Sequence, residues 1–209
     1  FTVVNATTLS VVVPAGVVGS AAIVVTTGGG TGTGTGLFSY VDYTVNTVPN
    51  GGGVVMTVTN ISNTSDTLNV SGTGGNITFA AAGRAFSLNG AAAVTGSLTT
   101  AIPTTATINS IINLNTQGGD DVLNLGTIAG ALPNFNVDGG TGADTVNVTG
   151  TLAQSSATSF GASLTAETVN IGPSSAWSVP AGSLGLTADT VEIDPTATIS
   201  LSNNLGVSR

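Results

Sequence analysis

The chain has 209 residues, of which 41% are hydrophobic and only 6% are charged, and its formal net charge is −8. It contains no His, Cys or Lys, which excludes Ser-His-Asp and Cys-His nucleophiles, Schiff bases, thiolate or imidazole metal sites and P-loops. Its two basic residues, both Arg, cannot supply the basic cluster that nucleic acid requires, so no nucleic-acid partner is expected.

The apolar content is high enough to bury a core, so the chain is expected to fold. Apolar residues recur at every second position, and windows rich in helix-forming residues are lacking. The sequence therefore predicts an all-β fold. The apolar stretch 17–25 is interrupted by Gly19 and Ser20 and is too short to cross a bilayer, so no membrane insertion is expected.

Residues 1–41 are the first predicted unit. Strands are predicted to enter Val13-Pro14-Ala15-Gly16, to include Ile23-Val24-Val25 and to close with Phe38-Ser39-Tyr40-Val41, and the Thr/Gly tract 31–36 is predicted to be a flexible turn. This pattern resembles the second half of an IPT/TIG domain, an immunoglobulin-like β-sandwich of surface receptors and bacterial adhesins. The resemblance implies a partial sandwich that starts in mid-domain. A generic β-hairpin with a Gly-rich turn is the alternative.

Residues 42–108 are predicted to be a transitional, irregular β segment. Asp66-Thr67-Leu68-Asn69-Val70 has the form of a repeat found later in the chain, but it lies 55 residues before the next copy, which starts at Asp121. That spacing is not a multiple of the later period, so insertions are expected to interrupt any coils before residue 109. Arg84 is expected to pair with an acid or to stack at a rim.

Residues 109–209 contain an internal repeat in which an acidic residue is followed by x-apolar-Asn/Glu-apolar. The four copies are spaced by 23, 23 and 22 residues and begin at Asp121, Asp144, Glu167 and Asp189. Trp177 and Ile199 are also 22 residues apart, which supports the same period independently. An all-β period of this length is typical of one coil of a β-helix, so we expect a right-handed parallel β-helix (β-solenoid) with 22–23-residue coils.

Alternation within each copy predicts apolar side chains inside the coil and polar side chains outside it. The expected interior columns are Leu123, Val146, Val169 and Val191, and beside them Leu125, Val148, Ile171 and Ile193. The expected exterior rows are Val122, Thr145, Thr168 and Thr190, and beside them Asn124, Asn147, Asn170 and Glu192. Trp177 occupies the position of Ile199 one coil earlier, which favours packing over sugar stacking.

Residues 139–147 match the nonapeptide G-G-x-G-x-D-x-apolar-x of RTX proteins, in which glycine-bent turns and the Asp carboxylate bind Ca²⁺. The resemblance implies a Ca²⁺ site formed by Asp138, Gly140, Gly142 and Asp144, joined by Asp120 or Asp121 from the previous coil. Stacked carboxylates repel one another unless they are splayed, hydrogen-bonded to turn amides or bridged by a cation. The alternative is that the glycines only make the corner of a coil and that Asp144 caps its turn.

The composition, with no Cys or Lys and many Thr, Gly and Asn residues, resembles that of bacterial surface-layer and large secreted surface proteins. We therefore expect a structural and adhesive module, not an enzyme, of a secreted, cell-surface or extracellular-matrix protein, serving as a rod, filament or lattice subunit. Because Phe1 starts inside a sandwich pattern and Arg209 ends inside a coil, the expected partners are other copies or the rest of a longer chain, together with cell-surface glycans.

Two alternative functions follow from the β-helix prediction. A carbohydrate-active enzyme would use Asp120 and Asp121 as a paired acid and base, but adjacent strand residues point to opposite faces and the chain has no His or Lys to assist them. A glycan-binding or ice-binding solenoid would use the row of Thr145, Thr168 and Thr190, which Val122 interrupts at its head.

Overall fold

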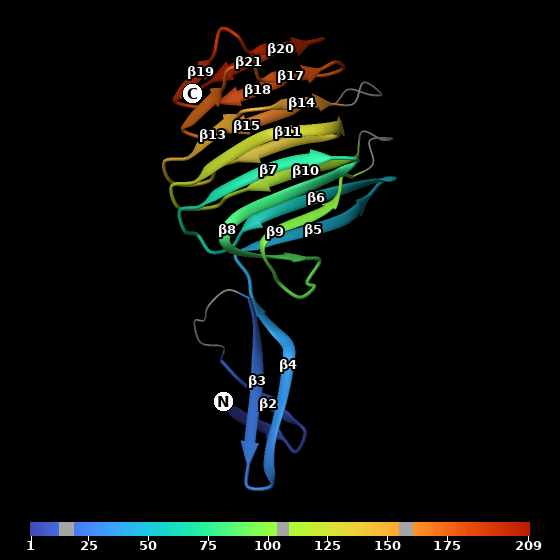
Figure 1. Ribbon diagram of the computed structural model, residues 1–209, viewed down its shortest axis with the longest axis vertical. Helices are drawn as coiled ribbons and strands as arrows, with labels where there is room; N and C mark the ends of the chain where they lie inside the picture. Colours follow the sequence, from blue (N-terminus) through green and yellow to red (C-terminus); the bar gives the residue numbers. More distant parts are fainter. Residues whose placement is uncertain (13–18, 104–108, 155–160) are drawn as a thin grey trace.

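The computed structural model describes residues 1–12, 19–103, 109–154 and 161–209. This part of the chain is all-β, as predicted, and it holds no helix of the length and hydropathy needed to cross a bilayer. Figure 1 shows a long hairpin near the N-terminus and a stack of strands that extends along the same axis toward the C-terminus.

Two antiparallel hairpins form the N-terminal part. They consist of β1 (Thr2–Asn5) with β2 (Thr8–Ser10), and of β3 (Gly19–Thr27) with β4 (Gly30–Tyr40). Among the described residues no strand pairing joins the two hairpins, although both line an apolar cavity of about 440 Å³. The structure therefore does not confirm an immunoglobulin-like sandwich, and the predicted Val13-Pro14-Ala15-Gly16 segment lies outside the described residues.

The prediction of a flexible turn at residues 31–36 is wrong, because this tract is part of strand β4. Its first four residues, 31–34, pair in register with β3 before the pairing shifts, and the hydroxyls of Thr26 and Thr31 lie 3.2 Å apart across the two strands. The alternating Thr side chains supply cross-strand contacts that offset the weak strand preference of the glycines between them.

Residues 111–208 form a β-solenoid of about four turns, which confirms the predicted β-solenoid. Each coil contributes three strands, and equivalent strands of successive coils pair in parallel. The solenoid therefore has three faces. The first face contains β10 (Ile111–Asn115), β12 (Asn134–Asp138), β15 (Ala162–Thr165), β18 (Leu184–Thr187) and β21 (Leu205–Ser208). The second contains the start of β11 (Val122–Leu132), β13 (Thr145–Val148), β16 (Thr168–Ile171) and β19 (Thr190–Ile193). The third contains the end of β11, β14 (Thr151–Gln154), β17 (Ala176–Val179) and β20 (Thr198–Leu201).

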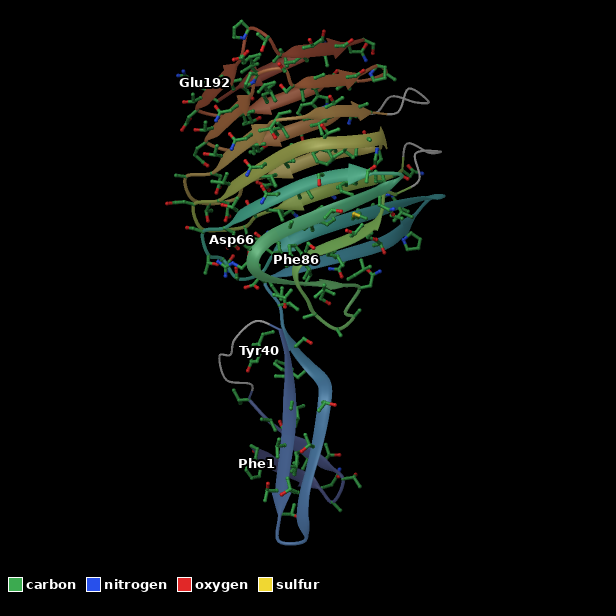
Figure 2. All side chains as sticks on the ribbon, viewed as in Figure 1. Phe1, Tyr40, Asp66, Phe86 and Glu192 are labelled. Atoms are coloured by element: carbon green, nitrogen blue, oxygen red, sulfur yellow. The ribbon has the colours of Figure 1, made fainter. Side chains whose placement is uncertain are left out.

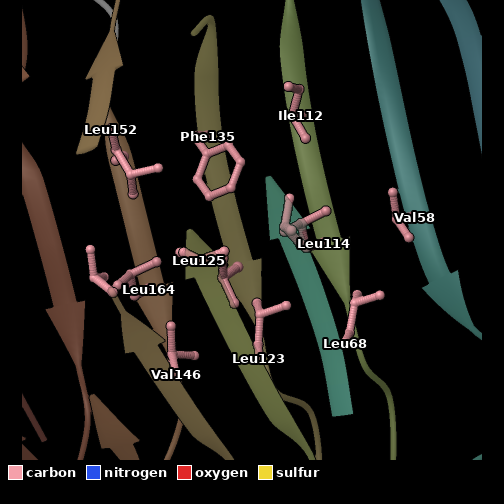
Figure 3. Close-up of a cluster of buried hydrophobic side chains, with 14 of the residues drawn as sticks. Val58, Leu68, Ile112, Leu114, Leu123, Leu125, Phe135, Val146, Leu152 and Leu164 are labelled. Carbon is pink, nitrogen blue, oxygen red and sulfur yellow. The ribbon is translucent and has the colours of Figure 1, made fainter. Parts of the chain in front are cut away.

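The predicted interior columns lie inside the solenoid, where aliphatic side chains from the three faces meet (Figure 3). Burial and parallel register are confirmed for Leu123, Leu125, Val146, Val148, Val169 and Ile171. Trp177 also belongs to this core and is 1% exposed. In the last coil the predicted parallel register also holds, but the predicted burial is wrong, because Val191 is only partly buried against the core and Ile193 is 44% exposed. No described strand covers the far side of β19.

Residues before 109 extend the same stack. The strands are β5 (Tyr43–Asn50), β6 (Gly53–Asn60), β7 (Thr67–Thr73), β8 (Asn76–Leu88) and β9 (Val94–Ala101). β6 pairs in parallel with β10, and β7 with β11, so residues 53–73 supply two faces of an additional coil. Thr67 lies beside Val122, which places the Asp66 motif in register. The 55-residue spacing arises because β8 and β9, which pair antiparallel, are inserted between this coil and the next.

Candidate functional site

Acidic residues line one corner of the solenoid, immediately before the strands of the second face. Three of these carboxylates each accept a hydrogen bond from the backbone N–H of the acid one coil earlier. The bonds join Asp66 N to Asp121 Oδ1 at 2.7 Å, Asp121 N to Asp144 Oδ1 at 2.9 Å, and Asp144 N to Glu167 Oε2 at 2.8 Å. We call these four residues the acid ladder. Figure 2 labels Asp66 near its N-terminal end and Glu192 in the last coil. The carboxylates are therefore tied to turn amides, one of the arrangements that stacking requires.

Arg84 closes the N-terminal end of the acid ladder. Its guanidinium forms an ion pair with Asp66 and lies 3.4 Å from Asp42 Oδ1, which confirms the predicted pairing with an acid. The Tyr43 hydroxyl donates to Asp66 Oδ2 at 3.2 Å. Burial, followed by the Asp66 charge, raises the pKa of the Tyr43 phenol, so it remains a hydrogen-bond donor. The charge of the Asp66 carboxylate is thus balanced by Arg84, and the carboxylate accepts a hydrogen bond as well.

The two middle members of the acid ladder, Asp121 and Asp144, are buried. Asp121 and Asp144 are each 2% exposed, and within the described part of the chain their Oδ2 atoms have no hydrogen-bond partner. Burial, with the charges of Asp144 and Asp66, raises the pKa of Asp121 to about 6. Burial, followed by the charge of Glu167, raises the pKa of Asp144 as well. These two carboxyl groups therefore bind protons more readily in the folded chain than in the unfolded chain.

This shift predicts that the folded chain is more stable in mild acid. Because the pKa of Asp121 is about 6 when folded and near 3.9 in an unfolded chain, the native state binds more protons between these values. The free energy of unfolding should therefore fall by about 1 kcal/mol or more as the pH rises from 4 to 7. Urea unfolding across this pH range measures the slope, which Asp121→Asn should reduce.

Asp194→Asn is the matched control, because hydrogen bonds from Thr196 lower the pKa of the exposed Asp194 carboxyl. Its removal should not flatten the slope. Equal slopes for the parent chain and the Asp121→Asn variant would contradict the assignment of this pH dependence to Asp121.

The predicted Ca²⁺ residues lie on one stacked corner. Their carboxylates already accept hydrogen bonds from backbone N–H groups of that corner. Asp138 Oδ1 accepts from Gly140 N at 3.1 Å, and Asp120 Oδ1 accepts from Ala143 N at 2.9 Å. Asp121 and Asp144 belong to the acid ladder. Across the described ranges, no three acidic side chains come together in a group that could hold a metal ion. Calcium binding therefore stays a prediction.

The glycines of the RTX-like motif allow the corners of two coils to approach closely. Gly140 and Gly142 have φ values of 88° and 139°. A Cβ atom would lie 1.9 Å from Gln117 O at Gly140 and 2.0 Å from Gly119 O at Gly142. The motif thus has a structural role in stacking, whether or not it binds a metal.

The calcium prediction can be tested by thermal unfolding. If Asp138, Asp144 and their neighbours bind Ca²⁺, the melting temperature should rise with calcium up to about 10 mM, because extracellular modules work in this weak range and binding to the native state stabilises it. Asp144→Asn should abolish the rise, and Mg²⁺ should not replace calcium. An unchanged melting temperature would leave Asp144 as a turn cap.

A second ladder runs along the outside of the second face. The amides of four Asn residues are joined coil to coil by hydrogen bonds of 2.9 Å from Nδ2 to Oδ1. This Asn ladder consists of Asn69, Asn124, Asn147 and Asn170. The sequence predicted the row from Asn124 onward but not its extension to Asn69, although the Asp66 motif carried the same Asn. Side-chain bonds therefore reinforce the parallel backbone ladder.

The proposed acid–base pair is not held in one place. Asp120 is exposed beside a cavity of about 370 Å³, whose lining also includes Arg84 and Ser65, whereas Asp121 is buried in the acid ladder. Sequence reasoning missed Asp42, which pairs with Arg84, since Asp42 belongs to no repeat. Its buried position between β4 and β5 is visible only in the fold.

At this corner, carboxylates thus join successive coils by accepting hydrogen bonds from backbone amides. Comparison with models of known protein families, with curated proteins and with solved structures finds no match in any of the three.

Proposed function

We propose that this chain is a rigid structural and adhesive module of a secreted, cell-surface or extracellular-matrix protein, in which it acts as a rod, filament or lattice subunit. The observation that carries the proposal is the use of the repeated polar side chains. The acid ladder and the Asn ladder both bind one coil to the next, in register with a continuous parallel sheet. These side-chain hydrogen bonds hold successive coils together along the axis of the solenoid.

The N-terminal hairpins support the adhesive part of the proposal. Phe1, Val3, Val4 and Val24 are each at least 58% exposed. Exposed apolar residues that gather on one part of a molecule are typical of protein interaction sites. The proposal includes an IPT/TIG-like origin for residues 1–41 and a right-handed coil, and it places the partners among other copies of this chain, the rest of a longer chain or surface glycans.

Localisation and shape test the proposal together. An antibody against the solenoid should label intact cells of the producing organism, and protease added to those cells should remove the label. Electron microscopy of the purified chain should show rods or end-to-end filaments. Labelling that appears only after cell lysis would overturn the surface assignment, and round, unassociated particles would overturn the rod.

A glycan-binding solenoid is the second candidate, favoured by the extension of the predicted Thr row. Thr67 lies in register at its head, so Thr67, Val122, Thr145, Thr168 and Thr190 follow one another on the second face. The Asn ladder runs beside this row and fixes its amides. Amide groups therefore repeat every ~4.8 Å along the axis, and hydroxyl groups accompany them in each coil except that of Val122. A neutral polysaccharide could form many weak bonds with this surface at once.

A matched pair of variants tests this second candidate. Thr168 and Ser178 are both partly exposed, belong to the same coil and point outward from different faces. Thr168→Arg should reduce retention on insoluble cellulose, chitin or β-glucan about fivefold or more, because a long charged side chain prevents flat contact. Ser178→Arg should leave retention unchanged. Equal retention of both variants, or no retention of the parent chain, would exclude this candidate.

A further inference from the structure

Asp42, which lies between β4 and β5, ties the base of the long hairpin to the solenoid. Asp42 is 4% exposed, and both its backbone groups are bonded. Its N–H donates to Ala85 O at 2.9 Å, and its carbonyl accepts from Ile61 N at 2.7 Å. Its carboxylate accepts from Ala85 N at 2.8 Å and lies 3.4 Å from the Arg84 guanidinium. One residue therefore contacts two separate segments of the solenoid.

An irregularity in β8 brings Arg84 to this position. The pairing of β8 with β9 shifts between Ala80 and Ala85, and Gly83 has a φ of 71°. A bulge of this kind re-aims a side chain at the edge of a sheet. Arg84 then pairs with Asp42 on one side, and on the other with Asp66, the first member of the acid ladder. The guanidinium of Arg84 thus connects the base of the hairpin to the acid ladder.

The contact of Ser39 with the loop after β8 is longer. Ser39 Oγ accepts a hydrogen bond from Ala93 N at 3.4 Å, near the upper limit for such a bond. Beside it lies a cavity of about 230 Å³ between the base and the loop after β8, lined by Phe38, Ser39, Val41 and residues of that loop. The bonds of Asp42 to Ala85 and Ile61, at 2.7–2.9 Å, are by contrast short and buried.

We infer that Asp42 and Arg84 form a clamp that fixes the direction of the β3–β4 hairpin on the solenoid. The reason for a rigid joint rests on the proposed function, since a spacer that carries load needs one. The clamp itself rests on the contacts above. Removing it should leave the solenoid folded and let the hairpin swing.

The absence of cysteine allows a direct test of the joint. Spin labels on Thr33→Cys in the hairpin and Thr73→Cys in the solenoid, both at exposed positions, report the distribution of distances between the two parts by pulsed electron paramagnetic resonance. The labelled parent should give one narrow distribution. Asp42→Ala should broaden it at least twofold, and Asp42→Asn, which keeps an oxygen for Ala85 N, should broaden it less. The control Asp194→Ala should leave it unchanged.

Trp177 separates a loosened joint from an unfolded chain, because it is the one Trp and is buried in the solenoid. A variant with native Trp177 emission and an unchanged distance distribution would overturn the clamp. If Asp42→Ala unfolds, Asp42→Asn carries the test, and an unchanged width in that variant would overturn the clamp equally. Surface labelling of cells does not depend on the joint, so failure of the proposed function is recorded separately.

Discussion

Substitution of Val169 by Asp is expected to unfold the solenoid or to lower its free energy of unfolding by at least about 4 kcal/mol. Val169 is fully buried, and its neighbours in the adjacent strands are Val146 and Val191. Of the two arginines, Arg84 pairs with Asp42 and Asp66, and Arg209 is exposed, so neither lies in the core beside Val169. A carboxylate at this position would therefore be buried without a partner. Urea unfolding followed by Trp177 emission measures the loss.

Thr168→Asp provides the matched control for this prediction. Thr168 precedes Val169 in the same strand and is partly exposed on the outer side, so the same carboxylate there remains in contact with water. Its effect should stay within about 1 kcal/mol. Similar losses for the two variants would show that strand β16 does not separate an interior from an exterior.

The part of the fold that repeats could be predicted, because each copy carries two periodicities at once. Alternation within Thr145–Val148 separates inside from outside, and the spacing of Asp121, Asp144 and Glu167 sets the coil length. Together they give the register that the structure shows. The same motif at Asp66 could not be placed, since the β8–β9 insertion gives a spacing that no single period explains.

The N-terminal hairpins show where local patterns were insufficient. Glycine has a weak strand preference, so the tract 31–36 was expected to be a turn. The pairing of β4 with β3 decides otherwise, and pairing is a tertiary property that strand preference alone does not fix. In the candidate site, likewise, the stacked acids could be predicted from one repeat position. The contact of Arg84 with Asp42 joins residues 42 positions apart and follows no pattern.

Substitution of Gly140 by Ala is the second large effect that we expect, at about 3 kcal/mol or more. Two costs add at this position. The φ of 88° strains any residue with a side chain, and the new Cβ would lie 1.9 Å from Gln117 O in the coil before. The backbone oxygen can move away only if the two corners separate, which would break the 2.7 Å bond from Thr141 N to Gln117 O.

Gly75→Ala isolates the first cost from the second. Gly75 has a φ of 79°, close to that of Gly140, but no atom lies within 4 Å of the position its Cβ would take. Its substitution should therefore cost only the backbone strain, about 1 kcal/mol. Thermal and urea unfolding of both variants measure the difference, which is the contribution of close corner stacking. If the two variants lose the same stability, the RTX-like glycines provide turn geometry alone, and the corner of the solenoid does not depend on the close approach of its coils.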